Sequence, residues 1–113
     1  MRYPQSEVPM LLPSTVTKEP QINAAVAEVV RELSPAVQRI RYEIGQDWTG
    51  EWVIFFRVLL SDEASKKRNL RKIAPLVISR MSDEFFPLGL GLIPHFDFRS
   101  EAEQAAAHEP AWA

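Results

Sequence analysis

The chain has 113 residues, of which 46% are hydrophobic and 25% are charged, a composition typical of one globular domain. It contains no cysteine, which excludes disulfides and cysteine-ligated zinc. Its 13 basic and 15 acidic residues give a net charge of −2, which does not indicate a polyanionic partner. No apolar run approaches the roughly 20 residues that a membrane helix needs, so we expect a cytoplasmic protein without a membrane span.

The first twenty residues contain four of the nine prolines. Because proline fixes φ and removes a hydrogen-bond donor, residues 1–20 are predicted to form an extended arm. The arm carries an apolar patch, Val8–Pro13, which we expect to dock either on the chain's own domain or along a groove or sheet edge of another chain. Residues 21–107 would then form a single α+β domain, and residues 108–113 a short C-terminal tail.

The first element in chain order is a helix over residues 21–33. Its apolar residues recur at the spacing of one helical face: Ile22, Val26, Val29 and Leu33. Alternating side chains then predict two strands, over residues 39–43 and 51–60, and the turn residues between them predict a hairpin.

A second helical region is predicted from Ser61, which can cap it, to about residue 86. Pro75 interrupts its apolar stripe, so the pattern indicates either one kinked helix or two short helices. A third strand is predicted over residues 92–99, where apolar and polar side chains alternate again.

Ser100 and Glu103 have the spacing of a capping box, which predicts a last short helix over residues 101–107. The element order is therefore α-β-β-α-β-α. A helical connection between the second and third strands makes them parallel. We expect an α+β fold with two layers: a three-stranded mixed sheet, its first strand central, with the helices on one face.

Side-chain alternation assigns the sheet residues to two faces. The helix-covered face is expected to be apolar throughout: Ile40, Tyr42, Ile44, Trp52, Ile54, Phe56, Val58, Leu60, Phe96 and Phe98. From the opposite face we predict a partner interface, made of Arg39, Arg41, Val53, Phe55, Arg57, Leu59, His95, Asp97 and Arg99. Large apolar groups mixed with arginines are typical of binding hot spots.

Arg57 is the only charged residue between Trp52 and Leu60, and either Asp97 or Glu43 can supply a carboxylate for it. The alternative interpretation of this face is a solvated surface with cross-strand ion pairs. Our main hypothesis is a non-enzymatic module that associates with a protein partner or with a second copy as a homodimer.

Two other function classes stay open. A basic run in the second helical region could contact nucleic acid through Lys66, Lys67, Arg68, Arg71 and Lys72. An enzyme or metal-binding protein would have to be built around His95, Asp97 and Arg99. No nucleotide-binding or catalytic motif is present and there are only two histidines, so we favour a non-enzymatic protein and expect no cofactor.

Three strings carry a family resemblance: DWTG at residues 47–50, FFRVLLSDEA at residues 55–64 and FDFRSEAEQ at residues 96–104. They resemble short uncharacterised bacterial proteins encoded beside HEPN-type proteins in toxin–antitoxin-like pairs. The resemblance covers residues 39–104 and implies a small, antitoxin-like, partner-binding protein of the bacterial cytoplasm. It brings no catalytic residues with it.

Overall fold

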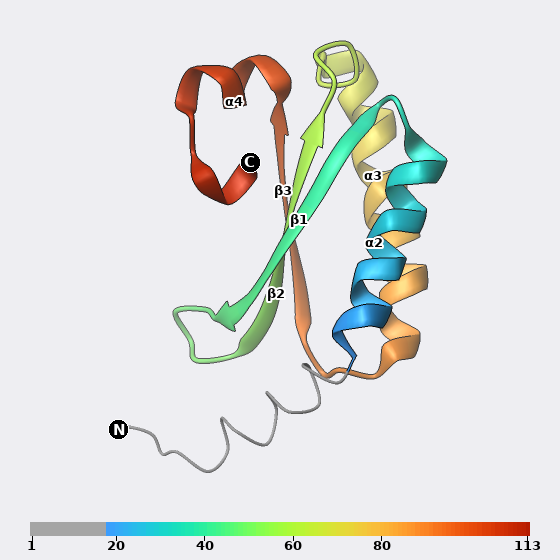
Figure 1. Cartoon of the computed structure of the whole chain (residues 1–113), viewed down its shortest axis with the longest axis vertical. Helices are drawn as coiled ribbons and strands as arrows, with labels where there is room; N and C mark the ends of the chain where they lie inside the picture. Colours follow the sequence, from blue (N-terminus) through green and yellow to red (C-terminus); the bar gives the residue numbers. More distant parts are fainter. Residues whose placement is uncertain (1–17) are drawn as a thin grey trace.

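A three-stranded mixed sheet forms the centre of the protein, for which a computed structural model describes residues 18–113 (Figure 1). The elements are α2 (Glu19–Leu33), β1 (Val37–Gln46), β2 (Trp52–Leu60), α3 (Lys67–Phe85), the 3-10 turn η1 (Phe86–Leu88), β3 (Ile93–Ser100), α4 (Glu101–Ala107) and the 3-10 turn η2 (Pro110–Trp112). The predicted α+β class and the order α-β-β-α-β-α are confirmed. No helix in the described part of the chain is long and apolar enough to cross a membrane.

The central strand is β2, which pairs antiparallel with β1 and parallel with β3. The predicted parallel pairing is therefore confirmed, whereas the prediction that the first strand is central is wrong. The physical reason lies in the strand compositions. Apart from Arg57, β2 is apolar on both faces and is the most buried strand, which suits a central position. The edge strand β1 carries polar side chains at alternate positions that solvent can reach.

Helix α2 begins at Glu19, so the arm predicted over residues 1–20 is too long at its end. Pro20 lies in the first turn of the helix, where a missing N–H breaks no hydrogen bond. The rest of the predicted arm, with its apolar patch, lies outside the described residues.

The second helical region contains one continuous helix, α3, which passes through Pro75 and begins at Lys67. The prediction that Ser61 opens this helix is wrong. The Ser61 hydroxyl caps only a turn, in which it accepts a hydrogen bond from the Ala64 amide at 3.1 Å. The capping box of α4 is confirmed, because the Ser100 hydroxyl accepts from the Glu103 amide at 3.1 Å and the Glu103 carboxylate accepts from the Ser100 amide at 2.8 Å.

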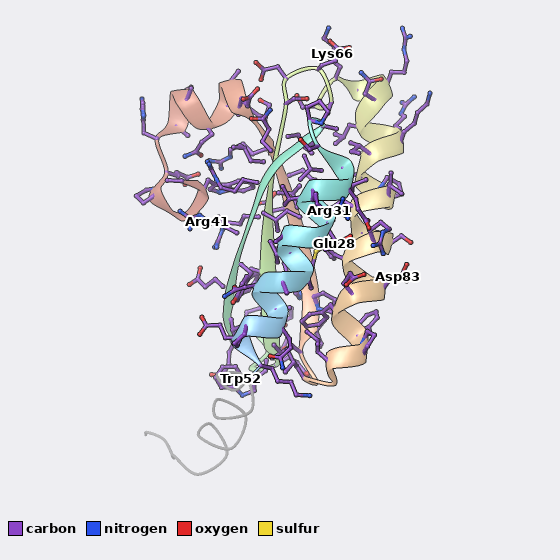
Figure 2. The ribbon with its side chains drawn as sticks, turned by 45° about the vertical axis from the view of Figure 1, so that its right-hand side comes forward. Glu28, Arg31, Arg41, Trp52, Lys66 and Asp83 are labelled. Atoms are coloured by element: carbon purple, nitrogen blue, oxygen red, sulfur yellow. The ribbon has the colours of Figure 1, made fainter. Side chains whose placement is uncertain are left out.

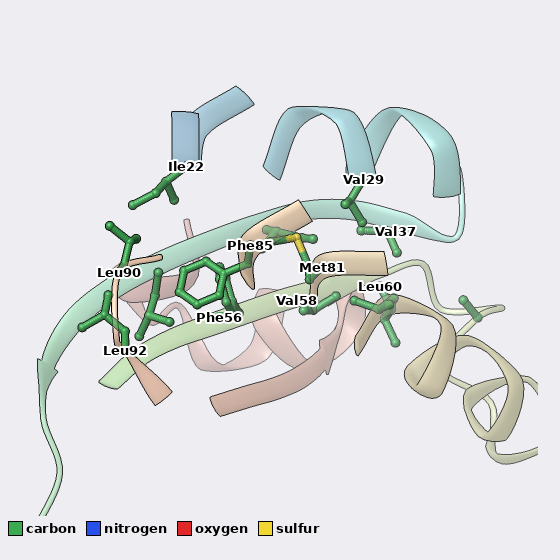
Figure 3. Close-up of a cluster of buried hydrophobic side chains, with 14 residues drawn as sticks. Ile22, Val29, Val37, Phe56, Val58, Leu60, Met81, Phe85, Leu90 and Leu92 are labelled. Atoms are coloured by element: carbon green, nitrogen blue, oxygen red, sulfur yellow. The ribbon is translucent and has the colours of Figure 1, made fainter. Parts of the chain in front are cut away.

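Helices α2 and α3 cover one face of the sheet and enclose the core with it (Figures 1 and 3). All ten residues predicted for this face lie in the core or pack against it. The ring of Phe56 is 1% exposed. It stacks on Phe96 with centroids 5.1 Å apart and meets Phe85 edge to face at 5.7 Å. The two-residue alternation therefore identified the buried face correctly.

The chain after β3 folds back over the opposite face of the sheet (Figure 1). We call residues 101–113, which include α4 and η2, the return segment. The prediction that the helices lie on one face thus holds for α2 and α3 but is wrong for α4. Residues 108–113, expected to be a tail, pack on the sheet because Trp112, at 4% exposure, is buried there.

Candidate interaction surface

The sheet face opposite α2 and α3 carries the residues predicted to bind a partner, and the return segment divides it into two parts. The closed half comprises the three arginines that the return segment contacts and the leucine in register between two of them: Arg39, Arg41, Arg99 and Leu59. The open half comprises the residues of the same face towards the hairpin: Glu43, Phe55, Arg57, Ile93, His95 and Asp97.

In the closed half, two arginines of β1 bind the main chain of the return segment. Arg39 Nη2 donates a hydrogen bond to the main-chain oxygen of Trp112 at 3.1 Å. Arg41 Nε donates to the main-chain oxygen of Ala113 at 2.8 Å, and its Nη2 donates to the same oxygen. Arg41 is labelled in Figure 2 beside the turn of the return segment. Both guanidinium groups are therefore held within the chain.

The third arginine of the closed half, Arg99 on β3, makes three contacts with the return segment. Its guanidinium lies 4.5 Å from the centroid of the Trp112 ring, within the range of a cation–π interaction. It also forms an ion pair with Glu109 and a hydrogen bond of 3.1 Å to the side chain of Gln104. These contacts explain why Trp112 is buried although it lies in a short, largely exposed segment.

In the open half, Arg57 of the central strand lies between Arg41 and Asp97 in register. Its Nη1 donates to a Glu43 oxygen at 3.0 Å, so Glu43 is the carboxylate that pairs with it in the chain. The Arg57 side chain is 23% exposed, compared with 63% for Glu43. Arg57 is thus partly withdrawn from solvent while its partner carboxylate stays accessible.

Aromatic and charged groups of the open half surround a hollow of about 270 Å³. It is lined by Phe55, Arg57, His95 and Asp97 together with Phe56 and Phe96. The Phe55 and His95 rings lie against each other with centroids 5.6 Å apart. Asp97 has no cationic group within 4.0 Å among residues 18–113, which leaves a free carboxylate beside a cation and two rings. Such a mixture suits the side chains of a protein partner.

Not every residue of the predicted interface is accessible. Val53 is fully buried and Leu59 is 6% exposed, so neither presents its side chain to a partner. Ile93, which the sequence analysis left out, is 44% exposed on the open half. Extending the alternation of β3 back by two residues from His95 would have identified it. Trp112 was also left out, because a lone tryptophan after proline has no periodic signal.

The predicted basic run occupies the loop before α3 and the first turns of that helix; Lys66 is labelled at the top of Figure 2. Lys66 forms an ion pair with Glu63 at 3.0 Å, and this contact lowers the pKa of the Glu63 carboxyl. Lys67, Arg68, Arg71 and Lys72 have no carboxylate within 4.0 Å in the described part of the chain. The first turn of α3 contains no acidic residue, so the helix dipole there repels the charges of Lys67 and Arg68.

A cavity of about 380 Å³ lies next to this basic run. It is bordered by the turn before β1, the loop after β2 and the first half of α3, through Pro35, Ala36, Ser61, Glu63, Ala64, Asn69, Lys72, Ile73 and Leu76. Most of these side chains are apolar, and Leu76 is 45% exposed. The cavity is therefore an apolar depression next to cations.

The trio proposed for an enzyme or metal site does not converge on one point. His95, Asp97 and Arg99 share a face of β3, but His95 packs on Phe55 and Arg99 is engaged by the return segment. Residues 18–113 contain no group of three or more histidine, aspartate or glutamate side chains that could hold a metal ion. The geometry gives the trio no common centre at which chemistry could take place.

Comparisons with protein-family models, with curated proteins and with solved structures found no match to this chain.

Proposed function

We propose that this protein is a small, non-enzymatic interaction module of the cytoplasm that binds a protein partner through the open half of the sheet face. The partner is either a second copy or the product of a neighbouring gene. The observation that carries the proposal is the hollow of about 270 Å³ in which Arg57, Asp97 and the Phe55–His95 pair come together.

The chemistry of these groups supports protein association. An aromatic ring supplies contact area at low conformational cost, and a half-buried arginine supplies directed hydrogen bonds, which is the composition of interface hot spots. The carboxylate of Asp97, which has no cationic group within 4.0 Å among residues 18–113, offers a charge that a partner's arginine or lysine can neutralise. Exposed Ile93 extends the apolar part of the same surface. The resemblance to antitoxin-like proteins points in the same direction, since such proteins act by binding a partner.

The proposal is tested by light scattering and sedimentation of the full chain, alone over a wide concentration range and mixed with the product of the neighbouring gene. We expect association that Asp97→Lys abolishes, because the new charge would face Arg57 and whatever cation the partner presents. The matched control is Asp83→Lys, on the exposed surface of α3, which should associate like the wild type. A strict monomer with no affinity for the neighbouring product would overturn the proposal.

A second candidate function is nucleic-acid binding by Lys67, Arg68, Arg71 and Lys72. It is favoured by one observation: these cations have no carboxylate within 4.0 Å among residues 18–113. We expect the chain to bind short RNA or DNA with an affinity that falls steeply as the salt concentration rises. Arg68→Ala and Arg71→Ala should each reduce this affinity. Absence of binding at low salt would reject this candidate and leave the sheet face as the functional surface.

A further inference from the structure

The closed half of the sheet face holds residues 109–113 in the way that a binding site holds a peptide. Three arginines from two strands contact a carboxylate at Glu109, an aromatic ring at Trp112, and two main-chain oxygens. Main-chain oxygens are present in any peptide, so the features that distinguish this segment are the acidic residue and the tryptophan three positions later.

The return segment is attached by few groups. Trp112 is its only buried side chain, Gln104 is half-buried, and its other residues are exposed. Segments with little buried apolar surface open locally at a much lower free energy than the whole domain unfolds. We therefore expect residues 109–113 to leave the sheet in a minor state of the native protein.

Opening would leave the closed half strongly cationic. Glu109 is the only aspartate or glutamate side chain within 4.0 Å of the guanidinium groups of Arg39, Arg41 and Arg99 in the described part of the chain, since Glu43 pairs with Arg57. Leu59, which is 6% exposed, lies in register between Arg39 and Arg99 and adds an apolar side chain to these cations. A site of this kind favours an acidic, aromatic peptide, because arginines bind carboxylates and peptide oxygens and stack on aromatic rings.

We propose that the closed half is a peptide-binding site, which residues 109–113 occupy within the chain and which accepts a partner segment of the same chemistry. That segment has an acidic residue followed three positions later by tryptophan. The return segment then acts as a competitor that the partner must displace. This inference does not rest on the proposed function, which uses the residues of the open half.

The test uses the full chain with Trp112→Ala, in which the internal ligand loses its anchor, and a labelled synthetic peptide of residues 100–113. We expect the variant to bind the peptide at least about tenfold more tightly than the wild type, in which the site is already occupied. Adding Arg99→Ala to the variant should remove this binding. A peptide with alanine in place of its tryptophan should not bind to the Trp112→Ala variant. Trp48→Ala, at a residue that is 96% exposed, is the matched control and should bind like the wild type.

A folded Trp112→Ala variant that does not bind the peptide, or that binds it equally well without Arg99, would overturn the proposal. Self-association of the wild type that Trp112→Ala abolishes would make a second copy the occupant, and would also count against a foreign partner. If Asp97→Lys abolishes self-association and Trp112→Ala does not, the association uses the open half. The two proposals can therefore be refuted separately.

Hydrogen exchange of the wild type provides a test that does not depend on the folding of a variant. The amides of Trp112 and Ala113 are hydrogen-bonded to the main-chain oxygens of Glu109 and Pro110 at 3.1 and 3.0 Å. Excess peptide should speed their exchange, because displaced residues lose this turn, while the amide of Met81 in the core should stay protected. Unchanged exchange at Trp112 and Ala113 under saturating peptide would contradict displacement.

Discussion

The two faces of the sheet differ in the contacts that their side chains need. The face under α2 and α3 is apolar throughout, and any well-packed apolar cover satisfies it. The opposite face carries Arg39, Arg41, Arg57 and Arg99, whose guanidinium groups need particular acceptors at particular distances. Residues 109–113 supply those acceptors over the closed half. Over the open half, the one acceptor that Arg57 has within the described part of the chain is the exposed carboxylate of Glu43. The first face holds the fold together, and the second is the surface that we propose for binding a partner.

The largest effect is expected on the helix-covered face. Phe56→Ala should lower the free energy of unfolding by about 3–5 kcal/mol, because it leaves a cavity between Phe85 and Phe96. Urea unfolding followed by circular dichroism measures this quantity. The control is its neighbour Phe55→Ala, on the open half, where the ring is only half-buried and the loss should stay below about 1.5 kcal/mol. Equal losses would break the comparison between the two faces.

A smaller effect is expected where the return segment is anchored. Trp112→Ala should lower the free energy of unfolding by about 1.5–3 kcal/mol, the value for burying one large side chain. The loss stays below that of Phe56→Ala because the segment can detach while the core remains packed. Trp48→Ala, at the tip of the hairpin, should leave stability unchanged in the same urea titration. A loss at Trp112 as large as that at Phe56 would show that the return segment belongs to the core.

The connection into the return segment should contribute less again. Ser100→Ala removes the cap of α4 and leaves the Glu103 amide without its acceptor, which costs about 1 kcal/mol. Hydrogen exchange should locate this loss in α4, with β3 unaffected. Ser79→Ala, on the exposed surface of α3, has no cap to lose and is expected to be neutral or slightly stabilising. Equal behaviour of the two serine variants would mean that the capping box does not stabilise α4.

The smallest effect concerns the turn that aligns β1 with β2 and therefore both faces. The hydroxyl of Thr49, at 2.6 Å, and the amides of Thr49 and Glu51 hydrogen-bond to the Asp47 carboxylate and hold its pKa below the ordinary value. Since the pKa is lower in the folded state, this stabilisation is present at neutral pH and is lost as the pH falls through the folded-state value. In an NMR titration, the chemical shift of the Thr49 amide should change with pH at a midpoint below the ordinary pKa of aspartate, because this amide is bonded to the Asp47 carboxylate. A carboxyl that titrates at its ordinary pKa would contradict this account of the turn.

Much of the fold could be predicted because it follows from local patterns. Side-chain alternation identified the buried face, and the spacing of Ser100 and Glu103 identified α4 with its capping box. The order of the strands was missed because compactness alone favoured a central first strand, although the apolar character of β2 on both faces was the better indicator. The role of Arg39 was out of reach, because its acceptor lies 73 residues away and no periodicity links the two positions.

The candidate site shows the same limit. Alternation correctly brought Phe55, Arg57, His95 and Asp97 to one face, since that depends only on strand periodicity. It could not show that Arg99 of the same face is already engaged, because its partners Glu109 and Trp112 come after the last strand. Whether a charged sheet face stays free depends on contacts that are distant in sequence.

The central claim is that the open half binds a protein, and Arg57 tests it most directly. Sedimentation equilibrium of the associating species should show that Arg57→Ala weakens association by about 2–5 kcal/mol, because removing the cation leaves the Glu43 carboxylate unpaired in the interface. The same variant should change the free energy of unfolding by less than about 1 kcal/mol, since the Glu43 carboxylate is 63% exposed and water can solvate it in the free chain. Lys67→Ala, in the basic run, should leave both quantities unchanged. Association that is indifferent to Arg57→Ala, or that Lys67→Ala weakens instead, would contradict the assignment of this surface.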